Sequence, residues 1–193
     1  MVTNDQVKEL RERTGISVMQ CKNALDEAGG DMEKAVLILR KKGGSIAEKK
    51  GDRTLAAGTI QAYVHSNKEV ASMVVLRSET DFVAKNEEFI KLAYELALQV
   101  AATNPEFVSR SEMPADKLEQ IKALYIKEVE GKPENLKEQI LSGKVDSFLK
   151  NAVLLEQSYI KDDSLTIKTL IDNATQKFGE RIEIEKFVRV STK

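Results

Sequence analysis

The sequence is poor in the residues that carry covalent chemistry, and each shortage excludes a class of protein. It has one cysteine and one histidine in 193 residues. A single cysteine forms neither an internal disulfide nor a thiolate metal site, so we expect a chain of the reducing cytoplasm. His65 alone cannot build a zinc site, and the glycines form no Walker A or dinucleotide-binding motif. We therefore expect no enzymatic activity, no catalytic residues, no metal site and no cofactor.

An excess of charge of one sign and a long apolar run are also missing. The 30 basic residues are offset by 31 acidic ones. Binding to a nucleic-acid backbone needs a surplus of cations on one face, so we expect no direct contact with nucleic acid. No apolar run approaches the roughly 20 residues that span a bilayer. The polar start MVTNDQVKEL does not resemble a signal peptide, and we expect no membrane association.

Residues 1–44 predict three short helices. Each begins at a side chain that can cap a helix: Thr3 or Asn4, Ser17 and Asp31. Apolar residues recur at helical spacing in all three: Val7 and Leu10, then Met19, Ala24, Leu25 and Ala28, then Met32, Ala35, Val36 and Leu39. We expect the third helix to end at Gly43–Gly44. Helices this short must share a core, which predicts a compact three-helix bundle.

The segment 45–54 is polar, and no clear periodicity runs through it. Between Arg40 and Arg53, six basic residues accompany only Glu48 and Asp52. No aromatic residue lies among these charges, so bases would find no surface to stack on. We interpret the segment as a solvated basic linker to a second domain, residues 55–193. A nucleic-acid patch is the alternative.

From residue 55 onward, strands and helices both occur. A period-two pattern at 60–64 and a second apolar segment at 70–76 lie so close together that they predict an antiparallel hairpin. A third strand is marked by alternating apolar residues: Ile182, Ile184, Val188 and Val190. Between them we expect helices at 80–102, 115–129, 134–141, 145–155 and 165–178, with breaks at Gly131–Pro133 and Gly143–Lys144. A three-stranded antiparallel sheet packed with helices gives an α+β fold.

One segment admits two interpretations, RSETDFVAKNE at residues 77–87, which leaves a strand and begins the first long helix. In the first, Ser78 or Thr80 caps that helix, Asp81 complements its dipole and Phe82 begins its buried stripe. In the second, the segment is a rigid protrusion that presents an acid and an aromatic ring to a partner. The residues alone leave both open.

The motif TDFVAKNEEF, together with KELRERTG and QCKNALDEAGGDMEKAV near the start, resembles bacterial translation elongation factor Ts. The resemblance continues through YVHSN, GKPENLKEQIL and GERIEIEKFVRV, and so covers nearly the whole chain. It implies a guanine-nucleotide exchange factor for elongation factor Tu and a ubiquitin-associated-type fold for the N-terminal bundle. Long members of the family carry a duplicated core. This chain has room for one core and is similar to the short form.

The resemblance also implies site residues. It places four of them beside the Mg²⁺ site of elongation factor Tu, in its GDP-bound and nucleotide-free forms: Thr80, Asp81, Phe82 and Val83. It implies that Arg11, Val18 and Met19 dock the bundle on the same partner, unless Met19 belongs to the bundle core. Many members have two methionines where this sequence has Val18 and Met19. His65 is a further candidate for a partner contact.

Two expectations concern other interactions. The bundle by itself also suits an adaptor that binds ubiquitin-like or nascent-chain partners, although this function leaves TDFVAKNE unexplained. A single three-stranded sheet has two open edges. It also carries more apolar surface than short helices cover: Ile60, Val64, Ile182, Ile184 and Val188. We therefore expect a two-fold homodimer through the core sheet.

Overall fold

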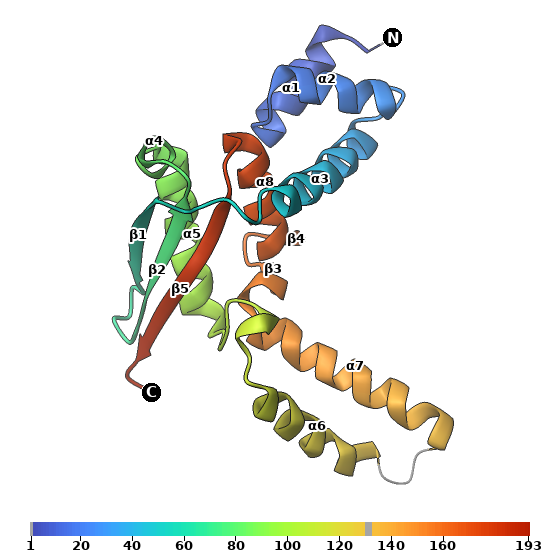
Figure 1. Ribbon diagram of the computed structural model, residues 1–193, viewed down its shortest axis with the longest axis vertical. Helices are drawn as coiled ribbons and strands as arrows, with labels where there is room; N and C mark the ends of the chain where they lie inside the picture. The colour runs from blue at the N-terminus through green and yellow to red at the C-terminus, as the bar shows by residue number, and fades with distance from the viewer. Residues whose placement is uncertain (1, 130–132) are drawn as a thin grey trace. The chain divides into compact units, whose positions relative to one another are not determined.

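The computed structural model describes residues 2–129 and 133–193. Its helices are α1 (Asn4–Thr14), α2 (Val18–Glu27), α3 (Met32–Lys49), α4 (Asp81–Ala84), α5 (Glu87–Thr103), α6 (Ala115–Val129), α7 (Glu134–Ala152) and α8 (Ile167–Phe178) (Figure 1). Its strands are β1 (Ala57–Val64), β2 (Val70–Ser78), β3 (Ser158–Tyr159), β4 (Asp162–Thr166) and β5 (Ile182–Ser191), and short 3₁₀ helices lie at Arg110–Glu112 and Leu154–Glu156. The predicted α+β class is confirmed.

The chain divides into two compact units. The first consists of the chain up to Ile60, Val75–Ala93 and Lys168–Ile184, and the second of Gln61–Val74, Tyr94–Ile167 and Glu185–Lys193. Each unit is described by itself below. The proposed division into domains 1–44 and 55–193 with a linker at 45–54 remains a prediction.

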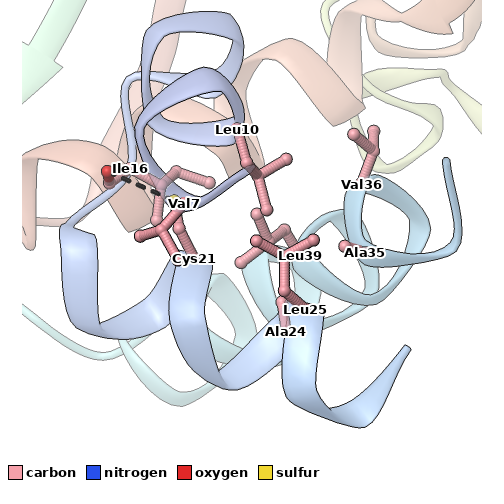
Figure 2. Packing of buried hydrophobic residues seen from close by; sticks show 9 residues of the cluster. All are labelled: Val7, Leu10, Ile16, Cys21, Ala24, Leu25, Ala35, Val36 and Leu39. Atoms are coloured by element: carbon pink, nitrogen blue, oxygen red, sulfur yellow. Dashed lines mark hydrogen bonds between the residues drawn. The ribbon is translucent and has the colours of Figure 1, made fainter. Parts of the chain in front are cut away.

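The three predicted N-terminal helices share one core. The side chains of Thr3, Ser17 and Asp31 accept hydrogen bonds from the first turns of α1, α2 and α3, as their positions in the sequence predicted. Nine buried residues pack together between the helices (Figure 2): Val7, Leu10, Ile16, Cys21, Ala24, Leu25, Ala35, Val36 and Leu39. Because each helix alone is marginal, this common core is what stabilises all three.

The prediction that α3 ends at Gly43–Gly44 is wrong, because the helix continues to Lys49. Gly43 is buried against α8, where an added Cβ would lie 3.0 Å from Gln176 Oε1 and 3.4 Å from the carbonyl oxygen of Asp172. Glycine here permits a close approach of two helices and does not terminate one. Its intrinsic cost in a helix, about 1 kcal/mol, is small compared with what helix packing contributes. The first half of the expected linker is therefore helical.

The main sheet has the strand order β1-β2-β5 and is antiparallel. On one face it packs against α5, where Ser72 Oγ donates a 2.6 Å hydrogen bond to the carbonyl oxygen of Ala97. The two branched apolar residues of β1 are not buried by this packing. Ile60 and Val64 are more than 60% exposed, whereas their neighbours in β1 are half-buried.

The apolar residues of β5 also differ in exposure. Ile182 and Ile184 are buried, so the expectation that they belong to an uncovered surface is wrong. Val188 and Val190 are exposed. Strict alternation would place all four on one face, yet the burial pattern does not stay regular along the strand, since Glu185 and Lys186 are both exposed.

One further expectation for the helices needs correction. The helices predicted at 134–141 and 145–155 are joined in the single helix α7, which runs through Gly143 and ends at Ala152. The cost of one glycine within a helix, about 1 kcal/mol, is too small to interrupt it. Of the break expected at Gly131–Pro133, Gly131 and Lys132 lie outside the described residues. Helices α6 and α7 pack through Ile121, Val145 and Leu149, and Val153, which follows α7, joins the same cluster. No helix within the described ranges is long and apolar enough to cross a membrane.

Candidate partner-binding site

The segment that was expected to begin a long helix forms a helix of one turn. Thr80 caps α4, its Oγ accepting a 3.4 Å hydrogen bond from the Val83 N–H. Asn86 then starts α5, its Oδ1 accepting a 2.9 Å bond from the Glu88 N–H. The continuous helix predicted at 80–102 is therefore wrong. Two capping side chains begin a helix twice within seven residues, and the helix is interrupted between them.

Phe82, on the short helix α4, lies in solvent. Its side chain is 82% exposed, whereas Val83 and Ala84 on the same turn are buried. Phe82 is thus not part of the buried stripe, which runs along α5 through Phe89, Ala93, Leu96 and Val100. Burying a phenylalanine side chain contributes roughly 1.5–3 kcal/mol, and this protein forgoes that stabilisation. A large exposed aromatic side chain on an ordered turn is typical of a binding surface.

A carboxylate lies next to this ring in the sequence. Asp81 is exposed and accepts a 2.7 Å hydrogen bond from Lys85 Nζ. This hydrogen bond and the charge of Lys85 lower the pKa of Asp81 from its ordinary value. At neutral pH, α4 therefore presents an ionised carboxylate and an aromatic ring on consecutive residues.

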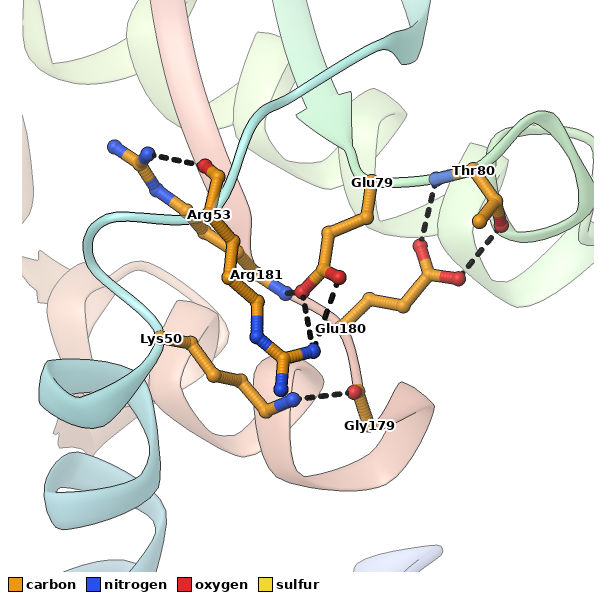
Figure 3. Close-up of polar contacts among 7 residues, drawn as sticks. All are labelled: Lys50, Arg53, Glu79, Thr80, Gly179, Glu180 and Arg181. Carbon is orange, nitrogen blue, oxygen red and sulfur yellow. Dashed lines mark hydrogen bonds and ion pairs between the residues drawn. The ribbon is translucent and has the colours of Figure 1, made fainter.

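A carboxylate from a distant segment holds the residue that caps α4. Glu180, which follows α8, accepts two hydrogen bonds from Thr80: Oε2 from the backbone N–H at 3.0 Å, and Oε1 from the hydroxyl at 2.6 Å (Figure 3). Sequence reasoning missed Glu180. The two residues are 100 positions apart, and no local pattern connects them.

Glu79 makes the reciprocal contact. Its Oε1 accepts a 2.6 Å hydrogen bond from the Arg181 N–H, and its Oε2 lies 3.1 Å from Arg53 Nη1 (Figure 3). Burial opposes ionisation of Glu79, but these two donors outweigh it and hold the pKa of its carboxyl below the ordinary value. The chain before α4 and the chain before β5 are thus joined through two neighbouring acids.

Basic residues of the expected linker complete this arrangement. Lys50 Nζ donates a 2.6 Å bond to the carbonyl oxygen of Gly179, and Arg181 Nη1 donates a 2.7 Å bond to the carbonyl oxygen of Arg53. Lys50 and Arg53 are therefore ordered by specific partners in the first unit. The interpretation of 45–54 as merely solvated is incomplete.

The three residues implied in N-terminal docking are exposed. Val18 and Met19 begin α2 and Arg11 lies near the end of α1, all with side chains in solvent. Met19 is 67% exposed, so the alternative that it belongs to the bundle core is wrong. Cys21, two residues further, takes the core position, and burial raises the pKa of its thiol.

His65 belongs to the second unit. It lies at the end of β1, is exposed, and its Nδ1 is 2.9 Å from the hydroxyl of Tyr63. A shallow pocket of roughly 180 Å³ is lined there by Tyr63, His65, Val70, Leu98, Ala101 and Ala102. Thr80–Val83 and the docking residues belong to the first unit.

Together these features describe a protein that acts through contact with another protein. A fixed turn presents an aromatic ring and a charge, and a separate helical bundle presents further apolar side chains. Comparison with known proteins gives the family. The family model described as Elongation factor TS matches residues 38–193.

Curated relatives agree over nearly the whole chain. Elongation factor Ts of Thermotoga sp. (strain RQ2) is 48% identical over 188 residues, which cover 97% of this chain and 94% of the relative. Elongation factor Ts of Herpetosiphon aurantiacus is 46% identical over 190 residues, with 97% and 96% covered. That of Desulforamulus reducens is 45% identical over 190 residues, with 97% and 88% covered. This chain belongs to the elongation factor Ts family.

Members of this family are guanine-nucleotide exchange factors for elongation factor Tu in translation. The function that the motifs predicted is thereby confirmed. The adaptor alternative finds no support in these comparisons.

Proposed function

We propose that this protein releases GDP from elongation factor Tu by inserting α4 beside the Mg²⁺ site of that partner. The observation that carries this proposal is the 82% exposure of Phe82 on a turn held at both ends. Thr80, Asp81, Phe82 and Val83 form the inserted segment. Phe82 acts as the wedge, and Asp81 offers a charge to polar groups around it.

The chemistry of the partner's metal explains why a wedge is sufficient. Mg²⁺ demands near-ideal octahedral geometry and bridges the phosphates to the protein, so a small displacement of its ligands weakens nucleotide binding steeply. By linkage, a factor that weakens GDP binding is itself bound more weakly when GDP is present. The partner is therefore engaged as the GDP complex and held most tightly without nucleotide. No covalent bond changes, and the protein needs no catalytic residue and no cofactor.

We also propose that the N-terminal bundle, as a ubiquitin-associated-type domain, docks on elongation factor Tu through Arg11, Val18 and Met19. The exposure of both apolar side chains at the start of α2 supports this role. This contact anchors the factor while α4 acts. We expect the complex to form in the cytoplasm without contact to nucleic acid.

We further propose a homodimer through the core sheet. Four apolar side chains lie exposed on strands of the second unit: Val64, Met73, Val188 and Val190. An apolar sheet face of this kind is the surface that a second copy covers in an isologous contact. His65 lies next to this sheet and is proposed as an additional partner contact.

Release of a fluorescent GDP analogue from purified elongation factor Tu tests the function. We expect the rate to rise with factor concentration and to saturate. A rate that does not change upon addition of folded factor contradicts the proposal.

A further inference from the structure

The helix α4 is too short to hold its own shape. It has four residues, whereas isolated helices in water are marginal below about 12–15 residues. Its buried side chains are only Val83 and Ala84. An exposed aromatic ring on such a turn would sample many directions unless other contacts fix the backbone that carries it.

Glu180 supplies a contact of that kind. Its two carboxylate oxygens take both donors of Thr80, the backbone N–H and the hydroxyl. Because the hydroxyl proton points to Glu180, a lone pair of the same oxygen is left to accept the Val83 N–H at 3.4 Å. One carboxylate thus places the first residue of α4 and also orients its cap.

The reciprocal bond from the Arg181 N–H to Glu79 secures Glu180 itself. Glu79 and Thr80 are neighbours, and so are Glu180 and Arg181, so the two crossing contacts join the same pair of backbone segments. Arg53 offsets the charge of Glu79, and this reduces the repulsion between Glu79 and Glu180. Two crossing contacts restrict rotation of one segment against the other more than one contact does.

We propose that Glu180 is a positioning residue for nucleotide exchange, which sets the direction of α4 and of Phe82 through Thr80. This rests on the proposed function of α4. Because Glu180 acts on geometry, its loss should reduce the maximal rate of GDP release and leave the affinity for the partner nearly unchanged. Small errors in positioning are costly wherever a contact acts only in the transition state.

Glu180→Gln in the full-length protein tests this proposal. Glutamine keeps the size of the side chain but carries no charge, so both charge-assisted hydrogen bonds to Thr80 are weakened. The Thr80 hydroxyl must also reverse its proton to accept from the amide N–H. In GDP release from elongation factor Tu, we expect the maximal rate to fall about tenfold, with the half-saturating concentration changed less than about twofold. Glu183→Gln is the matched control, since Glu183 pairs with the Arg181 side chain. We expect this control to exchange at the wild-type rate.

A double-mutant cycle with Thr80→Val gives the sharper result. If Glu180 acts through the Thr80 hydroxyl, then Thr80→Val slows exchange in the same way, and the double variant is no slower than Glu180→Gln alone. Thr80→Ser keeps the hydroxyl and should retain most of the rate. Fully additive losses overturn the proposal, and so does an unchanged maximal rate in Glu180→Gln.

Two further measurements distinguish a positioning role from misfolding and from docking. Circular dichroism melting shows whether Glu180→Gln is folded at the assay temperature. A loss that appears only as a rise in the half-saturating concentration would make Glu180 a docking residue and overturn the positioning role. If wild-type protein does not accelerate release, the proposed function of α4 fails, whereas wild-type activity with an unaffected Glu180→Gln variant refutes this inference alone.

Discussion

Phe82 and Met19 are large apolar side chains that the fold leaves in water. Phe82 is exposed because α4 ends after one turn, and Met19 because the adjacent core position belongs to Cys21. Exposed single apolar residues are common, but both of these lie in segments that the family resemblance assigns to the partner. At the scale of the residue, therefore, these side chains contribute little to the stability of the fold, and we expect them to contribute more to the stability of the complex with the partner.

Phe82→Ala should slow exchange and leave the fold intact. We expect the maximal rate of GDP release to fall about thirtyfold, which corresponds to about 2 kcal/mol, as for a hot-spot residue. The free energy of unfolding should change by less than about 0.5 kcal/mol, because the ring contributes little to the core. Parallel urea unfolding and GDP release measure both. If Phe82→Ala melts well below the wild type and each folded molecule exchanges nucleotide normally, the proposed role of Phe82 is contradicted.

Met19→Ala should act on docking and not on the wedge. We expect the half-saturating concentration for GDP release to rise about tenfold, while the maximal rate is retained, because the proposed contact of Met19 with the partner lies away from the nucleotide. Leu37→Ala is the matched control, an exposed apolar residue of the same bundle that lies outside the docking proposal. Equal effects of both variants would refute a specific role for Met19.

The depressed pKa of Glu79 predicts a dependence of stability on pH. A carboxyl whose pKa is lower in the folded state contributes stability above its unfolded pKa, and this contribution is lost as pH falls through the folded value. For Glu79 the loss therefore occurs below pH 4.5, its ordinary value. Glu79→Gln should be less stable than wild type at neutral pH, and the difference should shrink as the pH falls below 4.5. Urea unfolding at several pH values measures it, and a constant difference would be inconsistent with the ion pair.

At the scale of the element, two glycines within helices have opposite surroundings. Gly43 faces the buried side chain of Gln176, whose Nε2 is hydrogen-bonded to Gln20, so Gln176 is not free to withdraw. Gly143 faces open space. Both were expected to interrupt helices, and neither does. At Gly43 the neighbouring helix α8 leaves no room for a side chain, whereas at Gly143 a side chain would meet no obstacle.

The same substitution at both glycines tests this account. Gly43→Leu should destabilise the protein by roughly 2 kcal/mol through overpacking against α8. Gly143→Leu should stabilise α7 by up to about 1 kcal/mol, because leucine has the better helix propensity. Thermal melting followed by circular dichroism compares the two. If Gly43→Leu is as stable as wild type, the close approach of α3 and α8 is not a constraint.

At the scale of the whole molecule, the exposed face of the sheet predicts self-association. Light scattering at micromolar concentration should give twice the chain mass of 21.5 kDa. Val188→Lys should shift the mass to that of one chain, because burying an unpaired ammonium group in an apolar contact is costly. Leu124→Lys is the control, since Leu124 is also exposed but lies on α6. A wild-type monomer that exchanges nucleotide at full rate would show that a single core is sufficient for exchange and would contradict the proposed dimer.

The sequence by itself determined the parts of this protein that depend on neighbours in the chain. Thr3, Ser17 and Asp31 cap helices because their partners lie three residues away, and helical spacing identified most of the bundle core, although it wrongly included Met19. The TDFVAKNEEF motif indicated the family, since a contiguous segment can be recognised without the fold. The sequence also predicted the three strands of the main sheet, β1, β2 and β5, because alternation is a local signal.

The tertiary structure alone decided what distant residues do to one another. Glu180 reaches Thr80 across 100 positions, and no spacing rule connects them. Gly43 lies within α3 at a close approach to α8, which no local pattern revealed. Ile182 is buried and Val188 is exposed although the alternation assigned both to one face, because the part of a strand that is covered depends on what packs against it. These contacts and exposures depend on which helices and strands pack against each other, and a local sequence pattern does not contain that information.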